Sequence, residues 1–226
     1  MLRGLFITGT DTGVGKTVTA AALMHRYRAA APLRYWKPIQ TGIEEDDDTA
    51  VVRDLGGCAG QEIFDQGARL PRPVSPHLAA RLHGSAIEVK SMIQLAAGEP
   101  PQARWIVEGA GGVLVPLNGK EKMIDLMARL GLPAVVVARS SLGTINHTLL
   151  TLEALRSREL VVAGVVMVGE SNSDNRAAIE EFGNVPVLAE MPRFGVLTSD
   201  ALGQWAREHF DREGRLAEFL HVELNA

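Results

Sequence analysis

The chain has 226 residues, of which 46% are apolar and 22% are charged, and its net charge is −4. This balance predicts a single α/β domain over residues 1–226, and the negative charge excludes an overall field that would attract nucleic acid or an anionic membrane. One cysteine, Cys58, excludes an internal disulfide, and no run approaches the ~18 apolar residues of a membrane span. We expect a cytoplasmic protein.

Apolar, β-branched runs alternate with helix-like stretches along the chain. Such runs are typical of parallel strands that are covered on both faces, and here they predict strands over 5–8, 34–40, 105–107, 134–138, 161–168 and 185–188. Between them the sequence predicts helices over 17–30, 86–97, 123–130, 144–158 and 199–210, with shorter ones starting near 49 and 77. The helix at 86–97 is predicted from a capping box of Ser85 and Glu88. This order predicts a doubly wound, mostly parallel sheet with helices on both faces.

The segment at 9–17, GTDTGVGKT, joins the first strand to the first helix. In a loop of this kind successive backbone N–H groups turn toward a bound anion, and the helix N-terminus adds partial positive charge. Gly13 and Gly15 let the backbone approach closely, Lys16 is placed to reach the β- and γ-phosphates, and Thr17 offers a hydroxyl to Mg²⁺. The loop is one residue longer than the common pattern between its first glycine and the Gly-Lys pair. It predicts an ATP-using enzyme of the phosphate-binding-loop class.

Three charged side chains follow predicted strands or begin a helix. Lys37 lies near the carboxyl end of the strand at 34–40, where ligands collect in open α/β sheets. Asp48 closes an acidic run and stands just before a helix start, so we expect it to be a magnesium ligand and the four preceding acids to form a solvated loop. Glu108 stands at the tip of a buried strand before a glycine-rich turn, where a carboxylate would face a ligand.

Several stretches resemble the dethiobiotin synthetase family, namely GTDTGVGKT at 9–17, WKPIQTG at 36–42, SPH at 75–77, EGAGG at 108–112 and LGTINH at 142–147. The longer phosphate loop is that family's own spacing. The resemblance implies a P-loop NTPase fold and a reaction of 7,8-diaminopelargonic acid with CO₂ and ATP. One amine forms a carbamate, ATP phosphorylates the carbamate, and the second amine closes the cyclic urea with release of phosphate. This chemistry needs reactants held in register and a neutralised γ-phosphoryl charge.

The resemblance also implies roles for individual residues. It assigns catalysis to Lys37 and Lys16, and Mg²⁺ to Thr17, Asp48 and Glu108. It assigns nucleotide contacts to these same acids and to Gly13, Val14, Gly15, Lys16, Thr17, Gly109, Ala110 and Gly111. It assigns the diamine to Thr12, Thr41, Gly143, Thr144 and Asn146. The last three begin a helix that would receive the substrate carboxylate across a homodimer interface, since a helix N-terminus favours an anion.

One stretch departs from the family pattern. Residues 165–169 read VVMVG, where the family often ends in Asn-Asp and the Asn reads the adenine base. Neither Val168 nor Gly169 has a side chain that can make that hydrogen-bond pair. We expect backbone groups around Pro192, Arg193 and Phe194 to hold the base, with a looser preference among nucleoside triphosphates.

Two other classes remain open from the sequence. A partitioning-type ATPase switch shares the fold and a related loop, but it usually has a lysine where this chain has Thr10, and it would need a surface for DNA or membrane. An amide-forming ligase of the cobyrinic-acid type would need a glutamine-hydrolysing half with a nucleophilic cysteine, and Cys58 lacks that setting.

Overall fold

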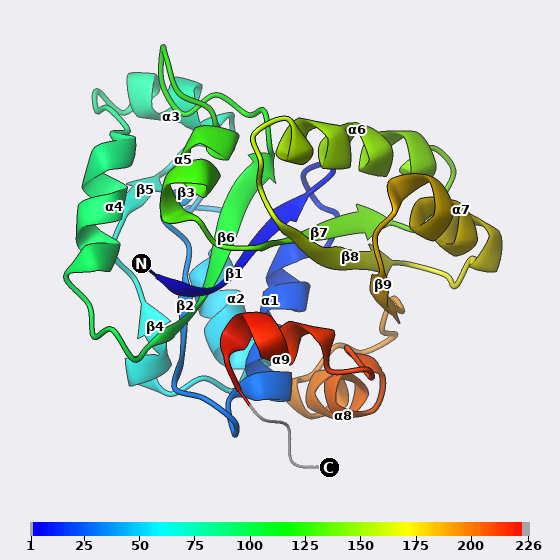
Figure 1. The fold of residues 1–226 in the computed structure, drawn as a ribbon. Coiled ribbons are helices and arrows are strands. Elements are labelled where there is room, and N and C mark those ends of the chain that lie inside the picture. The colour runs from blue at the N-terminus through cyan, green and yellow to red at the C-terminus, as the bar shows by residue number, and fades with distance from the viewer. Residues whose placement is uncertain (1, 223–226) are drawn as a thin grey trace.

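Parallel strands form the central sheet of the computed structural model, which describes residues 2–222 (Figure 1). The strand order is β4-β2-β6-β1-β7-β8-β9, and every neighbouring pair in the described part of this sheet is parallel. The strands are β1 (Arg3–Gly9), β2 (Leu33–Trp36), β4 (Ile63–Phe64), β6 (Arg104–Gly112), β7 (Ala134–Arg139), β8 (Val162–Val168) and β9 (Val187–Met191). The predicted doubly wound parallel sheet is confirmed.

Alternate residues of each strand pack into two cores on opposite faces of the sheet. Phe6 and Val107 pack under α3 (Pro76–Leu82), α4 (Val89–Ala97), α5 (Met123–Leu130), α6 (Thr144–Arg156) and α7 (Ser173–Gly183). Leu5 and Ile106 pack under α1 (Lys16–Tyr27), α2 (Asp48–Leu55), α8 (Ser199–His209) and α9 (Arg215–Leu220). Figure 1 shows the two groups of helices on either side of the sheet. Strands covered on both faces account for the continuous apolar runs of the sequence.

The predicted single strand over 34–40 is wrong. β2 ends at Trp36, and after Lys37 and Pro38 the chain starts a second short sheet, made of β3 (Ile39–Thr41) and β5 (Ala68–Leu70). Proline has no N–H and cannot continue a ladder, so the main sheet stops at this point. The break leaves Lys37 at the carboxyl end of β2, beside β6.

Most helix boundaries fall close to their predicted places, and α5 matches its prediction, with Gly131 ending it in the left-handed conformation. The capping box at Ser85 is wrong, because α4 begins at Val89 with Glu88 as N-cap, and the Ser85 hydroxyl instead donates to the Ala80 carbonyl. The patterns of α7, α9, β4, β5 and the 3₁₀ turn at Gly60–Glu62 were too short or too polar to be predicted.

Candidate active site

The segment between β1 and α1 forms the predicted phosphate loop. Gly13 and Gly15 have φ values of 70° and 100°, in the left-handed region that favours glycine. The Lys16 side chain is buried, and its Nζ donates to the Asp11 carbonyl at 2.9 Å. Burial lowers the pKa of Lys16, although the Glu108 carboxylate opposes this. The loop therefore presents backbone N–H groups and one desolvated ammonium, which is what a polyphosphate requires.

Four predicted site residues meet next to this loop, and they come from four different elements. The Thr17 hydroxyl at the start of α1 lies 2.6 Å from Asp48 Oδ1 and 3.1 Å from Glu108 Oε1. The Lys37 ammonium donates to Glu108 Oε1 at 2.7 Å and also contacts Asp48. The structure thus brings the carboxyl ends of β2 and β6 and the start of α2 together beside the phosphate loop.

This cluster is largely removed from water. The side chain of Glu108 is 0% exposed and that of Lys37 is 4% exposed. Burial alone would lower the pKa of Lys37, but the Glu108 and Asp48 carboxylates outweigh it and raise the pKa above its ordinary value. Burial acts in the opposite direction on Asp48, and the Lys37 charge outweighs it, so the pKa of Asp48 is lowered. Lys37 is therefore held as a positive charge between the carboxylates of Glu108 and Asp48.

Tyr35 is a part of this cluster that the sequence did not predict. Its hydroxyl, at the end of β2, donates to Glu108 Oε2 at 2.8 Å, and the side chain is fully buried. The motif at 36–42 begins one residue later, so no pattern drew attention to it. The register of β2 and β6, which sets Tyr35 opposite Ile106 on the same face of the sheet as Glu108, was the only signal that could have found it.

A second layer of polar contacts fixes the elements that carry Lys37 and Asp48. Asp47 is the N-cap of α2, accepting from the Thr49 and Ala50 N–H groups, and its carboxylate also accepts from Gln40 at 3.0 Å. Asp47 lies in an exposed loop, as expected, and these contacts order its carboxylate. Arg69 of β5 donates to the Lys37 carbonyl at 3.1 Å and to Gln40 Oε1 at 3.2 Å. The short second sheet thus holds the turn after Lys37.

The glycine-rich end of β6 passes close to its neighbours. A Cβ on Gly109 would lie 2.9 Å from the Phe6 ring, and a Cβ on Gly111, at φ 67°, would lie 2.8 Å from the Val115 side chain and 3.8 Å from the Thr12 hydroxyl. Gly111 and Thr12 therefore lie side by side, as expected of two residues that line one site. Ala110, between these two glycines, is buried, with 8% exposed.

Val168, at the end of β8, lies against the phosphate loop. A Cβ on Gly15 would come within 3.2 Å of the Val168 side chain, so the two residues pack closely. Gly169 has a φ of 135° and leaves room for the Ser140 hydroxyl, which would otherwise clash at 2.4 Å. Beyond β9, Pro192 and Arg193 are exposed, and Phe194 packs edge-on against Trp205. This end of the phosphate loop offers apolar contacts and backbone groups.

The residues expected to bind the diamine lie on the phosphate loop, in β3 and at the start of α6. Thr12 is exposed on the phosphate loop, and Thr41 is half-buried in β3. Gly143, with a φ of 93°, is the N-cap of α6, and Asn146 is exposed in the first turn. The Thr144 side chain instead turns into the core, 1% exposed, so only its backbone faces outward at this helix N-terminus.

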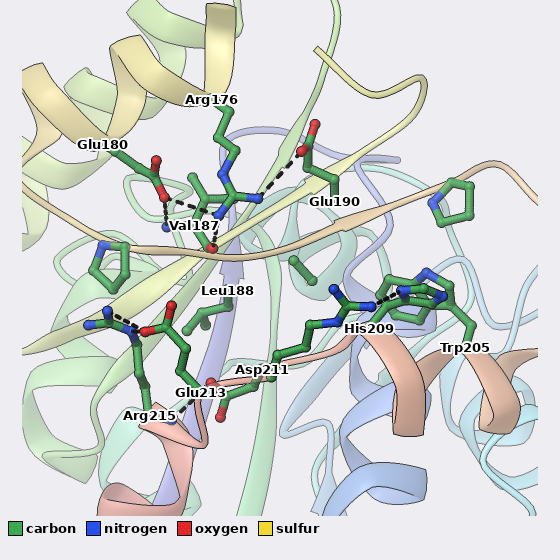
Figure 2. Close-up of a pocket in the computed structure, with 14 residues that line it drawn as sticks. Arg176, Glu180, Val187, Leu188, Glu190, Trp205, His209, Asp211, Glu213 and Arg215 are labelled. Atoms are coloured by element: carbon green, nitrogen blue, oxygen red, sulfur yellow. Dashed lines mark hydrogen bonds and ion pairs between the residues drawn. The ribbon is translucent and has the colours of Figure 1, made fainter. Parts of the chain in front are cut away.

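A separate cavity of about 550 Å³ lies along the outer side of β9 (Figure 2). At this edge strand the Val187 N–H donates to the Glu180 carboxylate, and the Val187 carbonyl accepts from Arg176. Side chains therefore cover the backbone groups of Val187. Arg176 also pairs with Glu190, and Arg215 pairs with Glu213. Only Pro192 of the predicted site residues lines this cavity, which therefore lies apart from the cluster around Lys37.

The fold and the phosphate loop define an ATP-using enzyme of the P-loop class. A ParA family ATPase from Chlorobium tepidum TLS superposes with a TM-score of 0.54 over 91% of this chain and 98% of that chain, at 12% identity. The septum site-determining protein MinD with Mg-ADP from Pyrococcus horikoshii OT3 superposes at 0.56 over 96% and 95%, at 16% identity. At these identities the likeness concerns the fold alone.

Sequence comparisons identify the family within this class. The AAA_26 family model, described as an AAA domain, matches residues 3–201. The ATP-dependent dethiobiotin synthetase of Paramagnetospirillum magneticum is 50% identical over 88% of this chain and 92% of its own length, and that of Agrobacterium fabrum is 44% identical over 96% of both. A bifunctional biotin biosynthesis protein of Bordetella avium is 45% identical over 91% of this chain, which spans 43% of that longer protein. The chain belongs to the family of ATP-dependent dethiobiotin synthetases.

Proposed function

We propose that the chain catalyses the ATP-dependent closure of 7,8-diaminopelargonic acid with CO₂ to the cyclic urea of dethiobiotin, as a step of biotin biosynthesis. The observation that carries this proposal is the buried Lys37, which reaches two carboxylates beside the phosphate loop. Because this reaction consumes ATP and small metabolites, the proposed place of action is the cytoplasm. Among residues 2–222, no helix is long and apolar enough to cross a membrane.

The proposed reaction balances without a covalent nucleophile from the protein. One amine of the substrate adds to CO₂ and gives a carbamate. A carbamate oxygen attacks the γ-phosphorus of ATP, ADP leaves, and a carbamic–phosphoric anhydride forms. The second amine attacks the anhydride carbonyl, the ring closes, and inorganic phosphate leaves. The protein must therefore hold two reactants in line and offset the charge on the moving phosphoryl group.

The two buried lysines are suited to that task. Lys16 and the backbone N–H groups of the loop stabilise the β- and γ-phosphates of ATP. Lys37 stabilises the transferring phosphoryl group and the carbamate, acting as a charge rather than as a base. Its raised pKa supports this role, because burial would lower the pKa and the carboxylates outweigh burial. In a water-poor site such fixed charges act with little reorganisation.

The oxygens of Thr17, Asp48 and Glu108 fit Mg²⁺, which prefers hydroxyl, carboxylate and phosphate oxygens. They lie together, with 2.6 Å from Thr17 to Asp48 and 3.1 Å from Thr17 to Glu108. Among residues 2–222 no group of three His, Cys, Asp or Glu side chains gathers to hold a metal. Mg²⁺ commonly takes phosphate oxygens and waters as its other ligands. When bound, Mg²⁺ supplies positive charge to the γ-phosphoryl group.

We also propose a homodimer in which the N-terminus of α6 lies at the interface and receives the carboxylate of the diamine. The apolar surface there supports this, since Leu142 is 100% exposed and Leu150 on the same helix is 57% exposed. Large apolar side chains exposed near one another can form part of an interaction site. The backbone N–H groups after Gly143 would face the anion.

One experiment tests the function. Purified protein is given the diamine, bicarbonate, Mg²⁺ and ATP, phosphate release is followed, and dethiobiotin is identified by mass spectrometry. We expect release only when both the diamine and bicarbonate are present, and none from a Lys16→Ala variant, which controls for a contaminating ATPase. Phosphate release that does not depend on the diamine would refute the synthetase activity and favour an ATPase switch.

A further inference from the structure

The buried carboxylate of Glu108 has its two oxygens in different environments. Oε1 accepts from the Lys37 ammonium at 2.7 Å and lies 3.1 Å from the Thr17 hydroxyl. Oε2 accepts from the Tyr35 hydroxyl at 2.8 Å. Tyr35 and Glu108 are each 0% exposed, so water does not compete for this hydrogen bond. The tyrosine hydroxyl thus bonds to the oxygen that does not contact Lys37 and Thr17.

This contact follows from the register of the sheet. β2 and β6 run parallel, with Tyr35 opposite Ile106 and Trp36 opposite Val107. Glu108 lies two residues beyond Ile106 and points to the same face of the sheet. The long tyrosine side chain reaches along the strand direction to meet it. Because Lys37 also lies on this face, two residues after Tyr35, one short segment supplies a partner for each oxygen of the carboxylate.

A buried carboxylate needs hydrogen bonds on both oxygens, and an unpaired one is costly. A glutamate that makes only one set of contacts can also rotate about its terminal bond and offer either oxygen. Residues that bond to metal-binding carboxylates commonly fix their orientation, and their loss typically lowers metal affinity or activity by 10–100-fold.

We propose that Tyr35 is a positioning residue for the metal-binding side of this site, holding Glu108 Oε2 so that Oε1 faces Thr17 and the cation. The proposal rests on the proposed function in one respect, namely that Glu108 serves the divalent ion. It adds a residue outside the motifs that the family resemblance identifies, and it predicts an effect on the metal rather than on the nucleotide.

The chain offers a matched control. Tyr27 on α1 is also 0% exposed, and its hydroxyl donates to the buried carboxylate of Asp211 near α9. Asp211 in turn accepts from the Arg215 and Leu216 N–H groups at the start of α9, on the opposite end of α1 from the phosphate loop. Tyr27→Phe therefore removes a buried tyrosine–carboxylate hydrogen bond without touching the site.

The test compares Tyr35→Phe with Tyr27→Phe by Mn²⁺ binding to the full-length protein with saturating ADP, followed through the electron paramagnetic resonance signal of free Mn²⁺. ADP affinity without metal is measured in parallel. We expect Tyr35→Phe to weaken Mn²⁺ binding at least about tenfold, with ADP affinity unchanged. Tyr27→Phe should leave both unchanged. Mn²⁺ affinity of Tyr35→Phe within about twofold of the wild type, or an equal loss in the two variants, would overturn the proposal.

The Glu108→Gln background, which lacks the Glu108 charge, tests whether the tyrosine hydroxyl acts through that carboxylate. We expect Tyr35→Phe to change Mn²⁺ affinity little in that background, because the hydroxyl acts through the carboxylate. A further tenfold loss there would show that Tyr35 acts elsewhere, and would overturn the proposal. Since none of these measurements uses the diamine, their failure is distinguishable from failure of the synthetase reaction.

Discussion

Replacing Lys37 by methionine is the most informative perturbation of the site. Methionine keeps most of the side-chain length and removes only the charge and its hydrogen bonds. In the native site the ammonium donates to Glu108 Oε1 at 2.7 Å and contacts Asp48, with 4% of the side chain exposed. The substitution is therefore expected to lower both kcat and the free energy of unfolding, each for a different physical reason.

The two effects have different expected sizes. Removing one electrostatic group from a preorganised site typically costs ~3–4 kcal/mol of transition-state stabilisation. Since ~1.4 kcal/mol corresponds to a factor of ten, kcat is expected to fall by about 10²–10³-fold. Removing one partner of a buried ion pair costs about 3–5 kcal/mol of folding free energy, because the remaining charge is uncompensated. Here the uncompensated groups are Glu108, which is fully buried, and Asp48.

The assay measures kcat from diamine-dependent phosphate release, and stability from urea unfolding with and without Mg²⁺ and ADP. We expect the loss of stability to shrink when Mg²⁺ and ADP are present, because the cation supplies positive charge next to the same carboxylates. Lys120→Met, at an exposed position, serves as the control and should change neither quantity. A Lys37→Met enzyme whose kcat stays within tenfold of the wild type would refute the reasoning.

Three further predictions concern other parts of the molecule. Val168→Asn should raise the kcat/KM preference for ATP over GTP and CTP; a wild-type enzyme that already rejects both tightly would contradict the looser base preference. The Asp125 carboxylate accepts the Lys122 N–H at 2.8 Å, and this bond lowers the pKa of Asp125 below its ordinary value of 3.8. The carboxylate therefore stabilises the fold above pH 3.8, and this stabilisation is lost as the pH falls through the lowered pKa of the folded state. Asp125→Asn should thus reduce the free energy of unfolding by roughly 0.5–1 kcal/mol at pH 7. The difference between wild type and variant should disappear only at a pH below the lowered pKa of Asp125. Leu142→Glu should convert a dimer into monomers in light scattering and raise the KM for the diamine, and an unchanged dimer would count against the proposed interface.

The parts of the site that a short segment determines were predictable from the sequence. The phosphate loop needs only glycines with positive φ, a lysine and a helix start, and all of these lie within the stretch at 9–17. The meeting of Lys37, Asp48 and Glu108 was also predictable, because carboxyl ends of parallel strands share one edge of the sheet. Asp48 was the third of these residues, and it was predicted from the helix that starts there.

The supporting contacts were not predictable, because they depend on register and on elements without a clear pattern. Tyr35 reaches Glu108 only because β2 and β6 pair as they do. Arg69 holds the turn after Lys37 from β5, a strand of three residues that no periodicity reveals. The break at Pro38, in contrast, could have been predicted, because proline has no N–H and cannot continue a ladder within a central strand.

The buried position of Lys37 argues that its charge is placed for chemistry rather than for folding. Taking an ammonium and a carboxylate out of water costs several kcal/mol per ion, and well-packed apolar residues in place of such a group are often neutral or stabilising. The chain nevertheless turns at Pro38 and uses Arg69 and Gln40 to fix the backbone around this lysine. Proteins of the same fold at 12–16% identity show that the sheet and its helices form with very different sequences. We therefore infer that Lys37 is buried for its action on a bound phosphoryl group. We expect the Lys37→Met enzyme to fold with Mg²⁺ and ADP but to turn over slowly, which would separate the catalytic role of this lysine from its role in folding.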